Sequence, residues 1–373
     1  TVNIIEVSKQ TQMYDMAYFV EYAIRDVVTH LLRQRGLSDT TVNRSAVENE
    51  LRTGGYHIYT TVDKSIQTAV QTTLSQWDKY PTLADSSKSS VVATDSDGAV
   101  ISETIQPQAA AVVLDYHTGE LRAIVGGRDE PTIRKTLNRA AQSYTEVGSS
   151  IKPLAVYGPA LDLGVSPASI VPNMDGPIAG WNTKKGYPAG GLSRYYGPVT
   201  LRRGVMSSLN VVAARVLMEK VTPAISANYL YQLGADESKI NVDGPGLALG
   251  TSGLTPIQMA AAYGAIANSG TYLEPLSFTK VIDDAGNVLL DADAVRDAHR
   301  VFQESTAYLL VDMMTDAVKS GTGTRAKIDD MTVAGKTGTN SDYASVYFAG
   351  MTPYYSSDVW IVHDYTAKKP NNC

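Results

Sequence analysis

Residues 148–154, GSSIKPL, place a serine and a lysine three positions apart at the start of an apolar helical pattern. Pro153 is tolerated only in the first turn of a helix, so we expect the helix to begin near Ser149. Residues three apart on a helix share a face, which lets Ser149 and Lys152 meet. Because the positive end of the helix dipole disfavours a lysine cation, Lys152 can become neutral and take the proton of the Ser149 hydroxyl. The pair indicates a nucleophilic serine, although a capping serine beside a solvated lysine would leave the same pattern.

A second polar pair lies at the mouth of another apolar helical pattern. Ser208 and Asn210 stand in the stretch SSLNVVAARVL. A hydroxyl can pass a proton and a side-chain amide can hold a peptide amide. This pair is therefore suited to binding and protonating a peptide.

A third motif, Lys336-Thr337-Gly338-Thr339, opens the last run of predicted strands. Alternation along a strand places Thr337 and Thr339 on one face and Lys336 on the other. Gly338 has no side chain, so the backbone of a ligand can come close there. Each of the three motifs is common when taken alone.

Three similar patterns elsewhere in the chain are predicted to be structural. Residues 277–280 repeat the serine–lysine spacing in an extended stretch, where positions three apart face opposite ways. Residues 226–228 repeat the serine–asparagine pair inside a predicted helix, where we expect the side chains to be solvated. Residues 319–322, KSGT, are typical of a helix end.

Hydrophobic periodicity predicts the elements that position these residues. Strands at both ends of the chain with helices between them predict an α+β fold, with a sheet assembled from distant segments. Further helices are expected over 19–32, with a stop at Gly36, and over about 305–318. A capping box at Ser45 to Glu48 predicts the start of another helix, which ends at Gly54-Gly55. Two more helices are expected, one after a cap at Asp63 and one that begins at Thr255 and Pro256. Strands are expected at 56–63, as a pair within 109–127 joined at Thr118-Gly119, and at 332–339, 345–353 and 357–364.

Two segments have the composition of connections. Residues 81–107 are rich in Ser, Asp and Thr around Asp97-Gly98, which indicates an exposed hairpin or a mobile insertion. Residues 173–198 are rich in Gly, Tyr and Pro and are too long for a plain connector. We interpret the second segment as a rim or lid.

The composition of the 373-residue chain excludes several classes of protein. With 43% hydrophobic residues it can bury a large core, and a net charge of −6 without basic patches argues against nucleic acid as a partner. Cys373 is the single cysteine and the five histidines are scattered, so we expect no disulfide, no metal site and no cofactor. No apolar run is long enough to span a membrane and no signal peptide is present. Because the chain begins at Thr1 without methionine, we expect a fragment whose membrane anchor lies upstream.

In the order Ser149, Ser208, Lys336, the three motifs resemble those of the penicillin-binding proteins. The resemblance covers roughly residues 56–365 and points to the transpeptidase domain of the class A, bifunctional members. It is carried by the stretches GYHIYTTVD, AAAVVLDYHTGELRAIVGG, LNRAAQ, GSSIKP, YGPVTLRRGVMSSLNVVAARV, LTPIQMAAAYGAIANSGTY, GTGT, VAGKTGT and YFAGMTP.

The resemblance implies a β-lactamase/transpeptidase-like α+β fold, with a five-stranded antiparallel sheet flanked by helices beside an all-helical subdomain. Residues 1–55 would be the remnant of an interdomain linker, 56–366 the transpeptidase domain and 367–373 a tail. The parent protein would carry a membrane anchor and a glycosyltransferase domain upstream. It would act on the extracytoplasmic face of the bacterial cell membrane, with other cell-wall synthesis proteins as partners.

The resemblance also implies a role for each residue of the first two motifs. Ser149 would attack the penultimate D-Ala carbonyl of a peptidoglycan stem peptide and expel the terminal D-Ala, with Lys152 as its base. Ser208 would relay a proton to the leaving amine, and Asn210 would hold the amide of the donor peptide. An amine from a neighbouring stem peptide would then take the acyl group.

The third motif would bind the end of the donor peptide. Lys336 would set a positive field, while Thr337 and Thr339, beside Gly338, would bind the terminal carboxylate. The N–H groups of Ser149 and Thr339 would form the oxyanion hole. β-Lactams would acylate Ser149 and so inhibit the enzyme.

The chain departs from the family pattern at two places. The family usually has Arg-Gln-Pro before GSS, where this chain has Thr145, Glu146 and Val147, and it commonly has Trp where Tyr347 stands. We interpret both departures as changes at the rim of the cleft that bear on β-lactam affinity.

Two alternative functions fit the same residues. A D,D-carboxypeptidase or β-lactamase-like hydrolase would let water resolve the acyl-enzyme, and a non-catalytic cell-wall scaffold or sensor would keep only the fold. Hydrolysis without cross-linking would identify the first, and a failure to label Ser149 with penicillin would identify the second.

Overall fold

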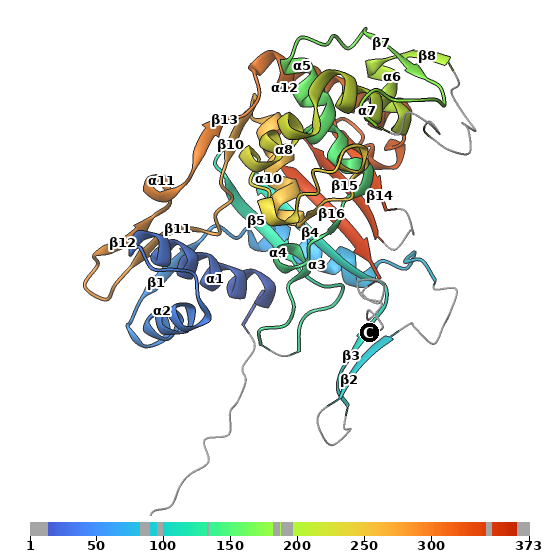
Figure 1. Cartoon of the computed structure of the whole chain (residues 1–373). Helices are drawn as coiled ribbons and strands as arrows, with labels where there is room; N and C mark the ends of the chain where they lie inside the picture. The colour runs from blue at the N-terminus through green and yellow to red at the C-terminus, as the bar shows by residue number, and fades with distance from the viewer. Residues whose placement is uncertain are drawn as a thin grey trace, which may run out of the picture.

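A five-stranded antiparallel sheet lies at the centre of the molecule (Figure 1). The computed structural model describes residues 14–82, 90–94, 100–132, 134–181, 187, 197–340 and 345–363. The sheet joins distant parts of the chain, as the sequence predicts, and the α+β fold with this sheet is confirmed. Its order is β14 (Ala334–Thr339), β15 (Ser345–Met351), β16 (Ser356–Val362), β4 (Gln108–Asp115) and β5 (Glu120–Val125).

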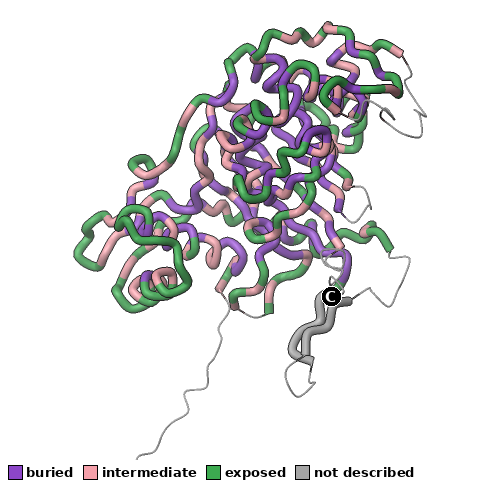
Figure 2. Tube along the Cα trace, viewed as in Figure 1, coloured by how far each residue is buried: buried purple, intermediate pink, exposed green. Residues whose placement is uncertain are grey.

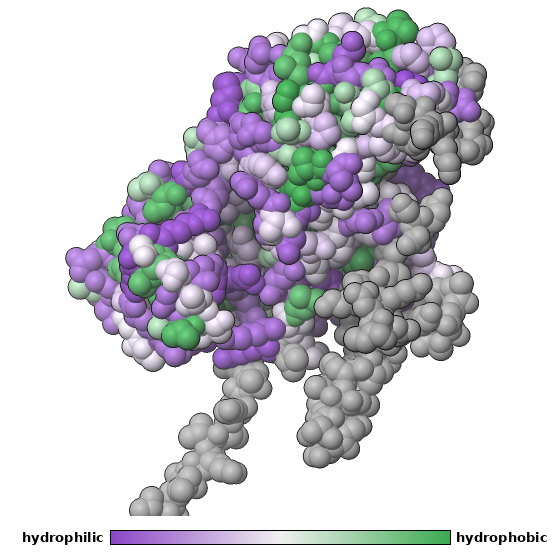
Figure 3. Space-filling view, viewed as in Figure 1, coloured by the Kyte–Doolittle hydropathy of each residue, from purple (hydrophilic) through white to green (hydrophobic). Residues whose placement is uncertain are grey.

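Helices cover both faces of this sheet, which explains why β4 is apolar at almost every position. Alternate β4 residues such as Ala110 and Val112 belong to the main core, together with residues of α10 (Pro256–Ala267). The residues between them, such as Ala111, pack on the other face with Leu74 of α3 (Lys64–Gln76). Buried residues accordingly follow the sheet and its covering helices (Figure 2). The visible outer surface is largely hydrophilic, with small scattered hydrophobic areas (Figure 3).

A largely helical part lies beside the sheet, on the side of β14 (Figure 1). The turn η2 packs directly against β14, and α12 contacts both β14 and α6. Helix, turn and strand bounds in this part are η2 (Gly148–Ile151), η3 (Pro153–Tyr157), α5 (Gly158–Asp162), β7 (Ile170–Asn173), β8 (Gly197–Thr200), α6 (Leu201–Met206), α7 (Asn210–Val216), η4 (Leu217–Val221), α8 (Pro223–Gln232), η5 (Glu237–Lys239), α9 (Pro245–Leu249) and α12 (Glu304–Ser320).

The N-terminal helices pack on the rest of the chain through a second antiparallel sheet. Phe19 near the start of α1 enters the main core, whereas Leu31 near its end packs with Phe278 of β11. Residues 14–55 are therefore in contact with the body of the molecule, and the domain boundaries at 55 and 366 stay predictions. The elements involved are α1 (Ala17–Gln34), α2 (Thr41–Thr53), β1 (His57–Thr60), β11 (Phe278–Ile282) and β12 (Val288–Asp291).

Outside the segment that carries Ser149, the predicted helices and strands are present, with one error at a helix start. The capping box at Ser45 and Glu48 is wrong, because α2 begins one turn earlier. Thr40 is extended and its hydroxyl accepts a hydrogen bond from the Asn43 N–H at 3.2 Å, so Thr40 is the N-cap. Glu48 is left inside the helix, where it pairs with Arg52 at 2.7 Å.

The two predicted connections are only partly described. The hairpin within 81–107 is present as the antiparallel pair β2 (Ser90–Thr94) and β3 (Val100–Ile105), and its turn at Asp97-Gly98 lies outside the described residues. Most of the rim or lid predicted at 173–198 also lies outside them, although β7 and β8 pair at its two ends. The shorter elements elsewhere are α4 (Arg139–Gln142), β6 (Thr145–Glu146), β9 (Gly253–Leu254), β10 (Thr271–Leu273), α11 (Ala292–Val295), β13 (Ala298–Arg300) and η6 (Thr324–Ala326).

Candidate active site

The turn that carries Ser149 is tighter than the predicted α-helix. The chain forms a 3₁₀ turn over Gly148–Ile151, then a π-helical turn over Pro153–Tyr157, and becomes α-helical only from Gly158. The predicted helix start is confirmed and the regular α-helix is wrong. In 3₁₀ geometry, positions three apart stand almost directly above one another. Ser149 is half-buried and Lys152 is completely buried.

Neighbouring elements hold this turn from two sides. Gly148 has a φ of 57°, which a residue with a side chain rarely adopts, and its N–H donates to the Gly250 carbonyl at 3.1 Å. The Ser150 hydroxyl donates to the Val147 carbonyl at 2.7 Å. From α10, the Tyr263 hydroxyl donates to the Ser150 carbonyl at 2.7 Å. These contacts fix the backbone on both sides of Ser149.

The Lys152 side chain reaches the corner between α6 and α7. Its Nζ donates to the Ser208 carbonyl at 2.9 Å and to the Asn210 Oδ1 at 2.6 Å, and it lies 3.4 Å from the Ser208 Oγ. Ser208 has a φ of 55°. Such a left-handed conformation is costly for serine, and residues of this kind concentrate at functional sites. The corner therefore presents the Ser208 hydroxyl and the Asn210 amide to the same amine.

The third motif lies on β14, against the Ser149 turn. Lys336 is completely buried and its Nζ donates to the Thr337 carbonyl at 2.9 Å, whereas Thr337 is half-buried and Thr339 exposed. The predicted alternation along this strand is confirmed. A Cβ at Gly338 would lie 2.2 Å from the Val147 carbonyl oxygen, so only glycine allows this close approach.

The same close approach brings the oxyanion-hole candidates together. A Cβ at Gly148 would lie 2.8 Å from the Thr339 backbone nitrogen. Ser149 follows Gly148 directly, so the two residues proposed to supply N–H groups come from adjoining stretches of η2 and β14. This geometry is suited to stabilising negative charge on a carbonyl oxygen between them.

Both buried lysines lose their preference for the charged form. Burial and the nearby Lys336 cation hold the pKa of Lys152 well below its usual value. Burial lowers the pKa of Lys336 to about 7. A low-dielectric site penalises an ammonium, and two ammonium groups close together penalise each other. Lys152 is therefore suited to accept a proton at neutral pH.

The structure brings the three motifs into one place. Lys152 contacts Ser208 and Asn210 directly and is coupled electrostatically to Lys336. The hydrogen bonds that Lys152 Nζ makes with described residues run to that corner and not to the Ser149 hydroxyl. A direct contact between Lys152 Nζ and Ser149 Oγ stays a prediction.

The similar patterns elsewhere do not reproduce the site, although the third reaches it through Thr322. Residues 277–280 run into the extended strand β11, and residues 319–322 close α12, as predicted. The expectation that Ser226 is solvated is wrong. Because α8 packs on η3, Ser226 is completely buried and its hydroxyl donates to the Ala155 carbonyl at 2.6 Å.

Two side chains near the site were not predicted to belong to it. The Thr337 hydroxyl donates to the Thr322 hydroxyl at 2.9 Å, and Thr322 lies in the GTGT stretch, to which the resemblance assigned no role. The Tyr187 hydroxyl shares a hydrogen bond with the Asn210 side chain. Tyr187 stands in the stretch interpreted as a rim or lid, and a long segment rich in tyrosine was the only sequence signal for it.

The two departures from the family pattern meet in space. Thr145 and Tyr347 share a hydrogen bond between their hydroxyl groups. Tyr347 lies opposite Gly338 across the β14–β15 pair and stacks on Trp360, with ring centroids 5.7 Å apart. Tyr347 is 4% exposed, so it lies beneath the cleft and not at its rim. The rim interpretation is therefore wrong for Tyr347, because the alternation of β15 turns its side chain inward.

No group of three or more His, Cys, Asp or Glu side chains in the described part of the chain is arranged to hold a metal ion. No helix there is long and apolar enough to cross a bilayer.

Comparisons with known proteins cover the stretch of chain that carries these residues. Residues 109–371 match the family described as "Penicillin binding protein transpeptidase domain". Penicillin-binding protein 1A of Clostridium acetobutylicum is 38% identical over 338 residues, which are 86% of this chain and 39% of that protein. Penicillin-binding protein 1A of Aquifex aeolicus is 35% identical over 260 residues, covering 69% of this chain and 34% of that protein. The chain thus spans well under half of the length of these relatives.

Solved structures show the same fold. Penicillin-binding protein PonA1 of Mycobacterium tuberculosis superposes with a TM-score of 0.70 at 22% identity, over 94% of this chain and 85% of that chain. Penicillin-binding protein 1A of Haemophilus influenzae gives a TM-score of 0.68 at 21% identity, over 96% of this chain and 67% of that chain. A third structure is PonA1 of Mycobacterium tuberculosis in complex with penicillin V. It superposes with a TM-score of 0.68 at 23% identity, over 92% of this chain and 84% of that chain.

Proposed function

The chain belongs to the penicillin-binding protein transpeptidase family, and from this premise we propose that its cleft is the active site of a serine D,D-transpeptidase. The observation that carries the proposal is the buried amine of Lys152, held by Ser208 and Asn210 beside the Ser149 turn. A completely buried lysine without a carboxylate partner is unfavourable as a structural element. A lowered pKa suits it to act as a base instead.

In the proposed acylation step, Ser149 Oγ attacks the penultimate D-Ala carbonyl of a stem peptide while Lys152 takes the hydroxyl proton. The N–H groups of Ser149 and Thr339 stabilise the oxyanion. When the peptide bond breaks, the proton passes through Ser208 to the leaving nitrogen, and free D-Ala departs. An acyl ester on Ser149 remains.

In the second step an amine of another stem peptide attacks this ester. The amine loses a proton to the Lys152–Ser208 pair, a new peptide bond forms, and Ser149 recovers its hydroxyl proton. The product is a cross-link between two stem peptides. Exclusion of water during this step distinguishes transfer from hydrolysis.

The surrounding side chains are suited to hold the donor peptide. Asn210 is exposed, so its amide is available to a peptide group while its Oδ1 accepts from Lys152. The hydroxyls of Thr337 and Thr339 and the Lys336 cation are suited to the terminal carboxylate. Thr322, which contacts Thr337, orients that hydroxyl. The structure corrects the expectation for Gly338: the room that this glycine leaves is taken by the Val147 carbonyl and the Ser150 side chain and not by a ligand backbone, so Gly338 holds the strand against the Ser149 turn.

The same cleft is proposed to bind β-lactams and to be blocked by them as an ester on Ser149. A penicillin complex is known for PonA1, whose fold this chain shares. Since the chain covers 39% of its Clostridium relative, we also propose a longer parent protein with an upstream glycosyltransferase domain and a membrane anchor. The site would then face the extracytoplasmic side of the bacterial membrane, where peptidoglycan stem peptides are found and other cell-wall synthesis proteins are available as partners.

The test is acylation by a fluorescent penicillin followed by mass spectrometry of the labelled peptide. We expect label on Ser149, none in Ser149→Ala, and a loss of about 10²-fold or more in the acylation rate of Lys152→Met. Lys280→Met is the matched control, because Lys280 belongs to the second serine–lysine pair and is exposed to solvent. Label on another residue, or equal losses in both lysine variants, would contradict the proposal.

A second measurement separates transfer from its alternatives. Donor peptide ending in D-Ala-D-Ala is incubated with an excess of a D-amino acid as acceptor, and the products are separated by chromatography. We expect the exchanged peptide together with free D-Ala. Hydrolysed donor alone would identify a carboxypeptidase, and unchanged donor with unlabelled Ser149 would identify a scaffold or sensor.

A further inference from the structure

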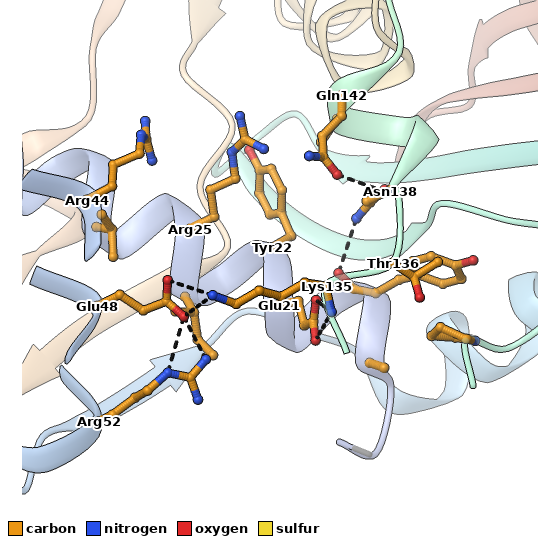
Figure 4. A pocket seen from close by; sticks show the side chains of 16 residues that line it. Glu21, Tyr22, Arg25, Arg44, Glu48, Arg52, Lys135, Thr136, Asn138 and Gln142 are labelled. Carbon is orange, nitrogen blue, oxygen red and sulfur yellow. Dashed lines mark hydrogen bonds and ion pairs between the residues drawn. The ribbon is translucent and has the colours of Figure 1, made fainter. Parts of the chain in front are cut away.

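A second pocket lies between the N-terminal helices and the segment that leads into α4 (Figure 4). Its volume is about 320 Å³, which is within the range of small-molecule sites, about 300–1,000 Å³. Its walls are one face of α1, one face of α2 and, from the segment before and within α4, Pro131, Lys135, Thr136, Asn138, Ala141 and Gln142; none of the cleft residues lines it. The pocket is therefore separate from the proposed active site.

At one end of the pocket, the charged groups pair with one another. The Lys135 backbone N–H donates to the Glu21 carboxylate at 2.7 Å, and its Nζ lies 3.0 Å from Glu48. Arg52 donates to the same Glu48 carboxylate at 2.7 Å (Figure 4). Lys135 has a left-handed φ of 59°, and these contacts hold it there. The charges at this end already have partners.

The other end presents donors that have no acceptor among the described residues: the side chains of Arg25 and Gln142 are exposed there, and Tyr22 is half-buried. The Arg25 guanidinium, the Tyr22 hydroxyl and the Gln142 side-chain amide gather there in Figure 4. The Gln142 Oε1 accepts from the Asn138 N–H at 2.9 Å, which leaves the Nε2 as the free group of this amide. Among the described residues, neither the Arg25 guanidinium nor the Tyr22 hydroxyl has a hydrogen-bond partner.

The charge at this end fits a single negative group. Arg25 is the cation there, because the nearby Arg44 guanidinium is held by Asp39 at 2.5 Å. Burial and the Asp26 carboxylate raise the pKa of Tyr22 well above its usual value, so its hydroxyl stays a donor. Asp26 itself accepts from Ser277 at 2.6 Å and is not available to Arg25. One cation and two neutral donors match a carboxylate better than a doubly charged phosphate.

Between the two ends the pocket is apolar. Val28, Ala141 and the ring of Tyr22 line it, together with the methyl group of Ala17. Apolar walls favour a ligand that has an apolar organic part to bury, and they offer no favourable contact to an inorganic anion.

We propose that this pocket binds a small amphipathic carboxylate, whose carboxyl group takes the Arg25, Tyr22 and Gln142 donors and whose apolar part lies between α1 and α4. The carboxylate would form a charge-assisted pair with the guanidinium and accept from the two neutral donors. The proposal does not depend on the chemistry of the Ser149 cleft.

The test is a titration of the whole 373-residue chain with 3-phenylpropionate, followed by ligand-observed NMR. The neutral amide 3-phenylpropanamide and inorganic phosphate serve as comparison probes. We expect saturable binding of the carboxylate, about tenfold or more weaker binding of the amide, and no saturable binding of phosphate at this pocket.

Variants assign the binding to the pocket. Arg25→Gln is expected to weaken 3-phenylpropionate about tenfold or more and Tyr22→Phe to weaken it severalfold. Lys64→Gln removes an exposed charge on α3 outside the pocket and is expected to change nothing. Circular dichroism melting checks that each variant is folded. The proposal is overturned if the wild-type chain does not bind the carboxylate, if binding survives Arg25→Gln, or if phosphate binds equally well through Arg25.

Discussion

At the scale of single residues, the cleft depends on two lysines that have been removed from water. Neither Lys152 nor Lys336 is exposed, and each lies near the other. Two full charges in one buried site would be strongly unfavourable, so at neutral pH the pair does not carry both protons fully. Lys152 carries two penalties on its charged form, burial and the neighbouring Lys336 cation, so Lys152 is the one expected to give up its proton. Lys336, whose pKa of about 7 places it at the edge of ionisation, is then the cation proposed to set the positive field beneath the substrate carboxylate.

This arrangement predicts how acylation depends on pH. Lys336 is protonated below its pKa and neutral above it, so a rate that needs its charge falls as the pH rises above about 7. We expect the second-order rate constant for acylation by a penicillin to show this basic limb. Lys336→Met should react slowly at every pH and lack the limb. A wild-type rate that still rises well into the alkaline range would contradict a role for the Lys336 charge.

At the scale of elements, the Ser149 turn is held between β14, β15 and α10. Tyr263 from α10 binds the carbonyl of Ser150, and Gly338 of β14 lets the turn approach the strand. Tyr347 of β15 reaches the chain that enters the turn, through the Thr145 hydroxyl. The two departures from the family pattern therefore form one contact. We infer that they compensate each other in positioning the turn.

A double-mutant cycle tests this inference. Tyr347→Phe removes one hydroxyl and Thr145→Val the other, and each should slow penicillin acylation severalfold, consistent with about 0.5–1.5 kcal/mol for one hydrogen bond. The double variant should be little slower than either single variant, because both remove the same bond. Tyr308→Phe is the matched control, since Tyr308 is 72% exposed on α12. Additive effects of the two substitutions would show that the residues act independently.

At the scale of the whole molecule, the N-terminal helices complete two cores. Phe19 of α1 lies in the main core, and Leu31 and Val47 cover Phe278 of the second sheet. Buried His30 strengthens this contact: burial lowers its pKa, but the carboxylates of Asp26 and Glu274, 3.3 Å and 3.6 Å from its ring nitrogens, outweigh that effect and raise the pKa to about 10. The segment expected to be a linker remnant is thus bound to the body of the protein.

Removal of this segment should weaken the fold. A chain that begins at Tyr56 would expose the apolar side chains of β11 and lose Phe19 from the main core. A buried Phe deletion costs about 3–5 kcal/mol, so we expect a clearly lower melting temperature and binding of a hydrophobic dye. Calorimetry and dye fluorescence on both chains provide the measurement. Equal melting temperatures would show that residues 1–55 are only a linker.

Local patterns in the sequence were sufficient for the elements and for the chemical types at the site. Periodicity, caps and turn residues predict the helices, the sheet strands and the alternation of Lys336 with Thr337 because these depend on neighbours a few positions away. The same locality explains the error at Ser45, where a plausible capping box lies one turn inside a helix that Thr40 starts. Spacing and chemical type predicted Ser149 as a nucleophile with Lys152 as its base, whereas family resemblance supplied the substrate and the roles of the remaining motif residues.

Tertiary structure alone decided what the motif residues touch and how their charges behave. The contact of Lys152 with Ser208, the pairing of Thr145 with Tyr347 and the burial of Ser226 join segments that are far apart in the chain. A pKa depends on desolvation by every surrounding atom, and a pocket such as that beside Arg25 exists only where separate elements meet. These properties belong to packing, which no short stretch of sequence contains.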